Sequence, residues 1–497
     1  MIRDPYMYAF NVKESLISHE KYAALFIFSI ASLIRIVPEL IAYPYPIGYD
    51  VINYYIPVVT NFDKFWFTIS AQFPFYVSLL HIINTGLSIS PHFVVTGFAI
   101  ITYGIFGVSI FFIGRKIFKI DISYSMYLAF FVIFQLTVLR TTWDLHRDLF
   151  SLSTMFLMFS LIYKRKQTDK RIIIAALMLS AITAMSDRMI GLLCTISLLI
   201  YTFNVKNRLT ILCSVVCTFF FAFSLIYGYG TLYSNTIDSL KSLPQTITPT
   251  FYNPTNLLIL FLVYNGLVTP VGIIGFKLAK DKLLKIPLLI SITGAFSWLI
   301  FQDLELLVAD RWIILCGIFL SIFAGYGIIQ LTRIKNTNIT KILAASFLCI
   351  VVGLGIIYAV MPYDGFSVYG IVGKYIQNFV PLTMQFNSLE ISNNDKLIDL
   401  ISWINKNTDP NSLIIGSKHW RGWMEIKLQD KRSYLTSDDL YGLYRSLANK
   451  HTTTNLYMIT TGGVEEEEGK QQQPSETKFK NVQMVYSDHL FNLFRIK

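Results

Sequence analysis

Residues 22–43 read YAALFIFSIASLIRIVPELIAY, and residues 44–50 continue as PYPIGYD. An apolar helix of about 20 residues crosses a hydrocarbon core of about 30 Å. The two loop prolines and Gly48 then predict a turn just outside the first span. That turn ends in an acid, Asp50, so the chain begins with a membrane span and an acidic loop.

The composition of the whole chain agrees with a membrane protein. Of 497 residues, 54% are apolar and 15% are charged, against about 25% charged in typical soluble domains. The mean hydropathy is +0.51. These values exclude a wholly soluble enzyme, a disordered chain and a collagen-like fibre, and they indicate a polytopic membrane protein.

Hydropathy predicts eleven helical spans in the first 361 residues. They are residues 22–43, 92–113, 123–140, 149–163, 172–186, 189–204, 209–230, 257–276, 286–301, 312–331 and 341–361. Residues 73–87 are apolar too, but the alternation of basic loops works only if they do not cross. We therefore expect an interfacial helix there, within a long first loop over residues 44–91.

Basic residues predict the orientation of these spans. The N-terminus and every second loop together hold 20 lysines and arginines, whereas the opposite loops hold 6. The positive-inside rule therefore places the N-terminus in the cytoplasm. With eleven spans, the C-terminal domain is expected on the external face of the cell membrane.

The net charge of +11 gives no reason to expect a nucleic-acid partner. Residues 362–497 contain 15 basic and 15 acidic residues, so the whole surplus lies in the membrane domain, residues 1–361. There it reports orientation. We therefore expect these basic residues to interact with the lipid bilayer, and we expect no nucleic-acid partner.

Residues 362–497 read as a small external α/β domain. Apolar residues at helical spacing predict a helix over 394–406, with Leu397, Leu400, Ile401 and Ile404 on one face. A second helix is expected over 438–449, after an N-terminal signal at Ser437. Strands are expected at 413–415, 456–459, 482–486 and 490–496, and a mobile loop at 465–473.

The first external loop offers a candidate catalytic acid. Asp50 is expected at the membrane surface, where it could act as a general base or a metal ligand. The alternative is a helix N-cap for residues 51–59 or a solvated loop acid. Tyr54 follows in the same loop, and we expect it to contact the substrate.

The second external loop, RTTWDLHRD over residues 140–148, is short and densely polar. Asp144, His146 and Asp148 could supply oxygen and imidazole ligands to Mg²⁺ or Mn²⁺. The alternative is a loop in which aspartate–arginine pairs anchor a helix end.

Arginines of the external loops are candidates for binding a lipid-linked phosphate, since a guanidinium grips phosphate bidentately. The candidates are Arg140, Arg147, Arg188 and Arg311. Each could instead extend to ordinary lipid headgroups.

Arg35 and Glu39, which are four residues apart in the first span, could be functional or could form a structural ion pair. The WRGW stretch at 420–423 could stack on sugars, but we favour a role in the domain core.

The loop acid after the first span, in Pro46-x-Gly-Tyr-Asp50, and the acids of the second external loop resemble the GT-C superfamily of membrane glycosyltransferases. The family includes protein O-mannosyltransferases, aminoarabinose transferases and the oligosaccharyltransferase catalytic subunit. Residues 35–39 and 143–148 are similar to uncharacterised archaeal members. The Trp-Trp-Asp-Tyr-Gly motif of the oligosaccharyltransferase branch is absent.

The resemblance implies an inverting transfer of a sugar from a polyprenyl (dolichyl) phosphate donor to a protein or glycolipid acceptor on the external face. It implies that Asp50 matches the family's catalytic acid and that Asp144 or Asp148 matches the acids that help to bind metal. Two other classes stay open: a lipid or polysaccharide transporter or flippase, and a non-catalytic scaffold. Paired broken helices at mid-membrane would favour the transporter.

Overall fold

The computed structural model describes residues 5–60, 62, 75–163, 169–205, 207–240, 254–297, 309–335, 337–361, 393–430, 432–436, 455–461, 482–488 and 490–496. The chain folds into two compact units. The helical unit comprises Met1–Tyr43 and Asp63–Gln385, and the α/β unit comprises Pro44–Phe62 and Phe386–Lys497. The start of the first loop therefore belongs to the same unit as the C-terminal domain.

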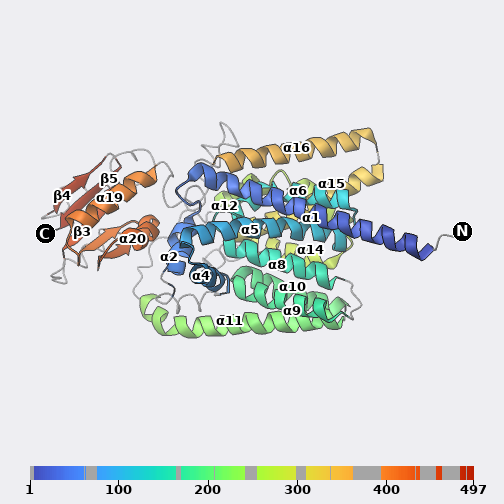
Figure 1. Ribbon diagram of the computed structural model, residues 1–497, viewed down its shortest axis with the longest axis horizontal. Coiled ribbons are helices and arrows are strands. Elements are labelled where there is room, and N and C mark those ends of the chain that lie inside the picture. The colour runs from blue at the N-terminus through green and yellow to red at the C-terminus, as the bar shows by residue number, and fades with distance from the viewer. Residues whose placement is uncertain are drawn as a thin grey trace. The chain divides into compact units, whose positions relative to one another are not determined.

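Each of the eleven predicted spans coincides with one helix or one broken pair of helices (Figure 1). The single helices are α1(Pro5–Ala42), α5(Pro91–Phe112), α8(His146–Ile162), α9(Lys170–Ser186), α10(Arg188–Val205), α11(Arg208–Leu240), α14(Lys282–Ala295), α15(Ala309–Lys335) and α16(Asn338–Val360). The pairs are α6(Ile122–Ile133) with α7(Leu136–Thr141), and α12(Pro254–Asn265) with α13(Thr269–Leu278). The predicted helical membrane domain is confirmed.

By length and composition, six helices within the described ranges can cross a membrane, or up to seven if α12 and α13 form one span. The count of eleven spans and the orientation of the termini stay predictions. Helix α4(Phe75–Leu87), 13 residues long, forms where the interfacial helix is expected.

Helix α15 is the centre of the helical unit. Every residue of its most apolar stretch is buried, and α13 packs along it through small residues. A Cβ at Gly275 would lie 1.8 Å from the carbonyl oxygen of Phe323, so only glycine permits this approach. Small residues of this kind allow close backbone packing between membrane helices.

The two helix breaks carry polar side chains that satisfy the interrupted backbone. Helices α12 and α13 are bent by 71°, and α6 ends at Ile133, two residues before Gln135. Thr137 Oγ1 donates to the carbonyl oxygen of Tyr264 at 3.1 Å, and Asn265 Nδ2 donates to that of Ile313 at 3.2 Å. Such partners are needed because lipid offers no hydrogen bonds to freed backbone groups.

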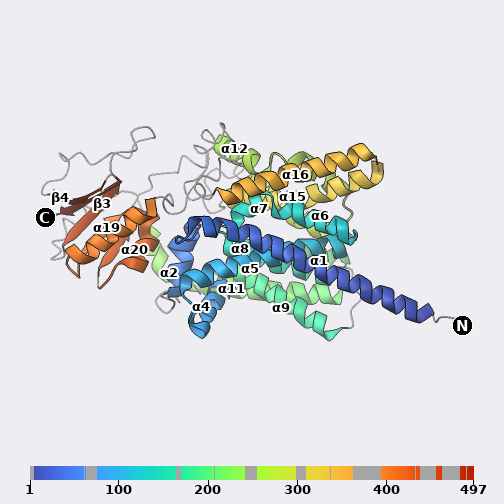
Figure 2. The same ribbon diagram turned by 45° about the horizontal axis from the view of Figure 1, so that its top comes forward.

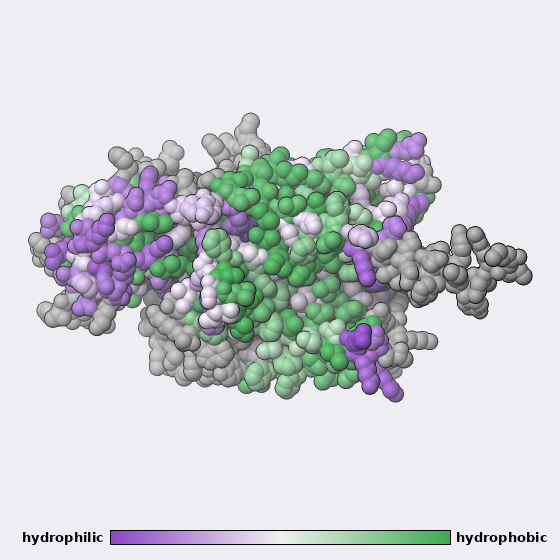
Figure 3. All heavy atoms as spheres, in the orientation of Figure 1, coloured by the Kyte–Doolittle hydropathy of each residue, from purple (hydrophilic) through white to green (hydrophobic). Residues whose placement is uncertain are grey.

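The outer surface of the helical unit is strongly apolar. Figure 3 shows a broad green surface over its helices. Ile226 of α11 is 74% exposed and Ile342 of α16 is 63% exposed. Exposed apolar side chains over so wide an area fit a surface that faces lipid.

The α/β unit contains a five-stranded sheet in the order β2-β1-β3-β5-β4. The strands are β1(Leu413–Gly416), β2(Ser433–Thr436), β3(Leu456–Thr461), β4(Val482–Ser487) and β5(Phe491–Ile496). Strand β1 pairs in parallel with β2 and β3, whereas β5 pairs antiparallel with β3 and β4.

The amphipathic helix predicted in this unit forms as α19(Asn394–Asn407), and its four predicted apolar residues are buried. The four predicted strands form as well. Two elements were not expected: strand β2 and the short helix α20(Arg421–Lys427). The expected helix at 438–449 and loop at 465–473 lie outside the described residues.

Candidate functional site

The second loop is a buried turn between α7 and α8, and not a solvated one. Arg140 and Asp144 are 3% and 5% exposed. The guanidinium grips the carboxylate through two hydrogen bonds, Nη1–Oδ1 at 2.6 Å and Nη2–Oδ2 at 2.7 Å. Asp144 thus serves as the counter-ion of Arg140, as the alternative of anchoring pairs expects.

A second ion pair on α1 supports the same turn. Arg35 Nη2 donates to Glu39 Oε1 at 2.6 Å, and Arg35 Nε donates to the carbonyl oxygen of Thr142 at 2.9 Å. Arg35 is 1% exposed. Because one guanidinium bridges α1 and the loop, the pair has a structural role.

His146 is buried at the start of α8 and precedes the predicted span over 149–163. Its Nε2 donates to the carbonyl oxygen of Thr142 at 3.0 Å. Burial, with a smaller effect of the Arg35 charge, holds the pKa of His146 well below its usual range. The imidazole is therefore neutral, and its Nε2 is committed to the backbone.

The most unusual feature of the helical unit is a pair of buried carboxyl groups. Asp148 on the first turn of α8 and Asp187 between α9 and α10 hydrogen-bond each other, and each is 3% exposed. Asp187 Oδ1 also accepts from the backbone N–H groups of Met189 at 2.8 Å and Ile190 at 3.0 Å. It thereby caps α10.

These surroundings give the two carboxyl groups opposite protonation. Both lie outside the predicted spans. Burial, and then the neighbouring Asp187 charge, raise the pKa of Asp148 well above its usual range. Burial alone would raise the pKa of Asp187 too, but Arg147 and the hydrogen bond from Asp148 hold it below the usual value. Asp148 therefore carries the proton, and its O–H donates a hydrogen bond to the Asp187 carboxylate.

Two of the predicted phosphate-binding arginines converge on this pair. The charges of Arg147 and Arg311 both act on Asp148 and on Asp187. Arg311 comes from the start of α15, so three segments of the chain meet here. Asp310, beside it, has a buried Oδ1 without a hydrogen-bond partner among the described residues. The charges of two arginines from different segments therefore act on one carboxyl pair.

Arg188 does not share this environment, since its side chain is exposed. Its neighbour Asp187, which is not one of the candidate residues predicted from the sequence, is the buried one. The sequence shows both residues in one hairpin between short spans. Nothing in the sequence alone says which of the two points inward.

The predicted metal ligands are not arranged as one donor set. Asp144 pairs with Arg140, His146 Nε2 donates to a carbonyl, and Asp148 hydrogen-bonds Asp187. Within the described ranges, no group of three or more histidine, cysteine or acidic residues could hold a metal ion. The Mg²⁺ or Mn²⁺ site stays a prediction.

Asp50 belongs to the α/β unit. It follows Gly48, whose φ of 111° is a conformation that favours glycine, and precedes a π-helix, η1(Val51–Tyr55). Single π-turns occur often at functional sites. Asp50 makes no side-chain capping hydrogen bond, so the helix-cap alternative does not account for this acid. Tyr54 is half-buried and packs edge-on against Tyr55 at 5.2 Å.

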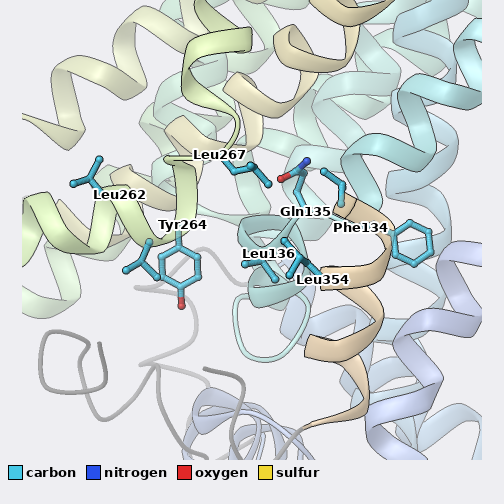
Figure 4. Close-up of a pocket in the computed structure, with 9 residues that line it drawn as sticks. Phe134, Gln135, Leu136, Leu262, Tyr264, Leu267 and Leu354 are labelled. Atoms are coloured by element: carbon cyan, nitrogen blue, oxygen red, sulfur yellow. The ribbon is translucent and has the colours of Figure 1, made fainter. Parts of the chain in front are cut away.

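A small pocket of about 110 Å³ lies in the helical unit where the two broken helices approach α16 (Figure 4). Gln135 and Tyr264 bring polar groups to it, and its other lining residues are apolar. The Gln135 Nε2 is buried and has no hydrogen-bond partner in the described parts of the chain. The pocket carries no charge, so it suits an apolar group or a few water molecules.

Comparison with known proteins supports the fold. No protein-family model matches the sequence, and no curated protein is significantly similar to it. ArnT from Cupriavidus metallidurans in the apo state superposes with a TM-score of 0.51 at 11% identity, over 95% of this chain and 97% of that one. ArnT bound to undecaprenyl phosphate gives 0.50 at 11% identity, over 96% and 97%. At 11% identity the likeness shows the fold: the chain shares the fold of ArnT over nearly its whole length.

Proposed function

We propose that the protein transfers a sugar from a polyprenyl-phosphate donor to a hydroxyl-bearing acceptor at the external membrane surface. The observation that carries the proposal is the buried Asp148–Asp187 pair together with the half-buried Arg147 and Arg311, whose charges act on it. The fold supports it, since ArnT has that fold and one of its structures contains undecaprenyl phosphate.

The cluster has the charge that a lipid phosphate needs. Removing charged groups from water costs several kcal/mol for each ion, so buried charges that shift each other's pKa often mark functional sites. Arg147 and Arg311 offer two planar guanidiniums, which suit the phosphodiester of the donor and the phosphate monoester that leaves.

In the proposed reaction, Asp50 accepts the proton of the acceptor hydroxyl. The hydroxyl oxygen forms a bond to the anomeric carbon from the face opposite the phosphate. The bond between that carbon and the phosphate oxygen breaks, and its electron pair leaves with the polyprenyl phosphate. Arg147 and Arg311 stabilise the charge that develops on the phosphate. A single displacement inverts the anomeric carbon.

Chain connectivity supports the role of Asp50. Seven residues separate it from Ala42, the last residue of α1, and α1 carries the Arg35 that binds the second loop. Asp50 is therefore tethered within about 30 Å of the end of that helix. The positive-inside rule supports placing this end on the external face.

A lipid transporter is the second candidate, and one observation favours it. The pairs α6–α7 and α12–α13 are broken helices that both line the pocket of Figure 4, as the transporter alternative expects. Transport also predicts a polar or charged pathway there. The pocket has two polar side chains, Gln135 and Tyr264, and no charged residue among its lining residues, and we therefore prefer the enzyme.

The test is to reconstitute the purified protein in liposomes with a native lipid extract. Mass spectrometry would look for an acceptor with an added sugar and for free polyprenyl phosphate in equal amount. Asp50→Asn is the matched control, because it keeps the shape of the side chain and cannot accept a proton. Movement of the lipid between leaflets without any sugar transfer would favour the transporter and contradict the proposal.

A further inference from the structure

The α/β unit holds the candidate catalytic turn directly. Helix α20 packs against both η1 and α2(Ile56–Thr60), the two helical segments that follow Asp50 (Figures 1 and 2). The residues around Asp50 therefore depend for their position on a domain more than 350 residues away in sequence.

One contact fixes the backbone of the turn. The backbone N–H of Gly422 donates to Asn53 Oδ1 at 2.8 Å. A Cβ at Gly422 would lie 2.0 Å from the carbonyl oxygen of Ile52 and 2.8 Å from the Cα of Asn53. Because both are atoms of the main-chain skeleton, no rotamer change could relieve the overlap. Only glycine allows the two segments to approach this closely.

Two aromatic contacts flank that hydrogen bond. The rings of Tyr49 and His419 meet edge-on with centroids 5.7 Å apart, and those of Tyr45 and Trp423 at 6.0 Å. Tyr45 also hydrogen-bonds Asp395 of α19. Residues 45, 49 and 53 thus hold the loop on both sides of Asp50.

The Asn53 amide is oriented by this contact and is not saturated by it. The Gly422 donor fixes Oδ1 on its side, and the amide nitrogen, Nδ2, is left buried without a hydrogen-bond partner among the described residues. An unsatisfied buried donor costs about 1–3 kcal/mol. If Asn53 served only to join the two segments, nothing would offset the free-energy cost of its unpaired Nδ2.

We propose that Asn53 and Gly422 are positioning residues that hold the Asp50 carboxylate in its reactive place, so that the C-terminal domain controls the chemical step through the first loop. The inference rests on the proposed function, because it takes Asp50 as the base. A displacement of about 1 Å from a remote change can lower a rate by about 10²-fold.

The test compares four variants with the wild type. Gly422→Ala forces the two backbones apart, and Asn53→Ala removes the acceptor. Asn53→Asp restores an acceptor of the same shape. Arg432→Ala is the matched control, because Arg432 binds the backbone of Asn405 and Thr408 within the same domain, and its hydrogen-bond partners among the described residues all lie between residues 405 and 430.

For Gly422→Ala we expect kcat to fall by about 10²-fold, and for Asn53→Ala by about tenfold, with unchanged affinity for undecaprenyl phosphate measured by native mass spectrometry. Asn53→Asp should regain most of the lost rate, and Arg432→Ala should lower the melting temperature more than it lowers kcat. Equal losses in Asn53→Ala and Arg432→Ala, or no recovery in Asn53→Asp, would overturn the inference.

Hydrogen exchange over residues 44–62 tests the contact without any sugar transfer. These amides should exchange faster in Gly422→Ala and Asn53→Ala than in Arg432→Ala. Unchanged exchange would refute the positioning contact. Absence of transfer by the wild type, together with the expected exchange pattern, would instead refute the proposed function alone.

Discussion

The two carboxyl groups of the Asp148–Asp187 pair should respond differently to the same change. In Asp148→Asn, the amide N–H replaces the O–H that donates to Asp187, which keeps its charge and both backbone donors. In Asp187→Asn, the pair can keep a negative charge only if Asp148 loses its proton. We therefore expect Asp148→Asn to be tolerated and Asp187→Asn to be harmful.

The size of the difference follows from the hydrogen bonds at Asp187. Its carboxylate accepts from two backbone N–H groups, those of Met189 and Ile190. A hydrogen bond to a charged group contributes about 1.5–3 kcal/mol, against about 0.5–1.5 kcal/mol for a neutral one. Losing the charge at two such bonds costs about 2 kcal/mol in total. Asp187→Asn should be less stable than Asp148→Asn by about that amount.

The assay is thermal unfolding of both variants in one detergent, followed by sugar transfer from lipid extract. Asp148→Asn should keep transfer within a few fold of the wild type. Equal destabilisation of the two variants would refute the assignment of the proton to Asp148. Loss of transfer in Asp148→Asn that excess Mg²⁺ or Mn²⁺ restores would show instead that Asp148 is a metal ligand.

The pH dependence gives an independent check. The pKa of Asp148 is raised in the folded protein, so the folded state binds more protons than the unfolded state at this group. Its contribution to stability is therefore present below the ordinary aspartate value of about 4 and is lost as the pH rises through the raised value. Asp148→Asn lacks this loss, so its stability relative to the wild type should improve as the pH rises above about 4. A constant difference across pH would contradict the assignment.

Three further predictions concern activity, topology and packing. Asp50→Asn should lower transfer by about 10²-fold or more without loss of folded protein, and near-normal transfer would remove Asp50 from the mechanism. In right-side-out vesicles, a cysteine at Thr168 should be protected from an impermeant label and one at Gln245 should react; the reverse pattern would invert the topology. Gly275→Ala should destabilise the helical unit by about 1–3 kcal/mol through overpacking, whereas Gly353→Ala, whose Cβ meets nothing within 4 Å, should have little effect on the melting temperature.

Periodicity in the sequence predicts the elements whose packing is local. The apolar face of α19 follows the 3.6-residue repeat of a helix, and all four residues assigned to it are buried. Strand β2 could not be predicted in this way because Ser433–Thr436 reads SYLT, with a polar residue at each end, whereas the equally short β1 reads LIIG, an apolar run. The helix breaks at Gln135 and Gly266 could not be predicted from hydropathy either, because a broken span has the same hydropathy as a straight one.

The candidate site could be predicted in its residue types and not in its pairing. The sequence marks Asp148, Arg147 and Arg311 as polar residues at span ends. Only the fold shows that Asp187 is the partner of Asp148, because this contact joins two different helix ends. The same holds for Arg140 and Asp144. Their spacing is compatible with a helical ion pair or with a metal site, and the structure shows a buried ion pair with two hydrogen bonds.

The assignment of Pro44–Phe62 to the α/β unit has a consequence for how this protein could be divided or recombined. The chain passes between its two units at three points, after residues 43, 62 and 385, and no single cut separates them. A truncation after residue 361 would leave the first loop without the glycine at 422 that it packs against. Exchanging the C-terminal domain with that of a relative would require residues 44–62 to be exchanged as well. Residues 44–62 and the C-terminal domain therefore have to be treated together in any deletion or exchange, although the sequence presents the two units as successive domains.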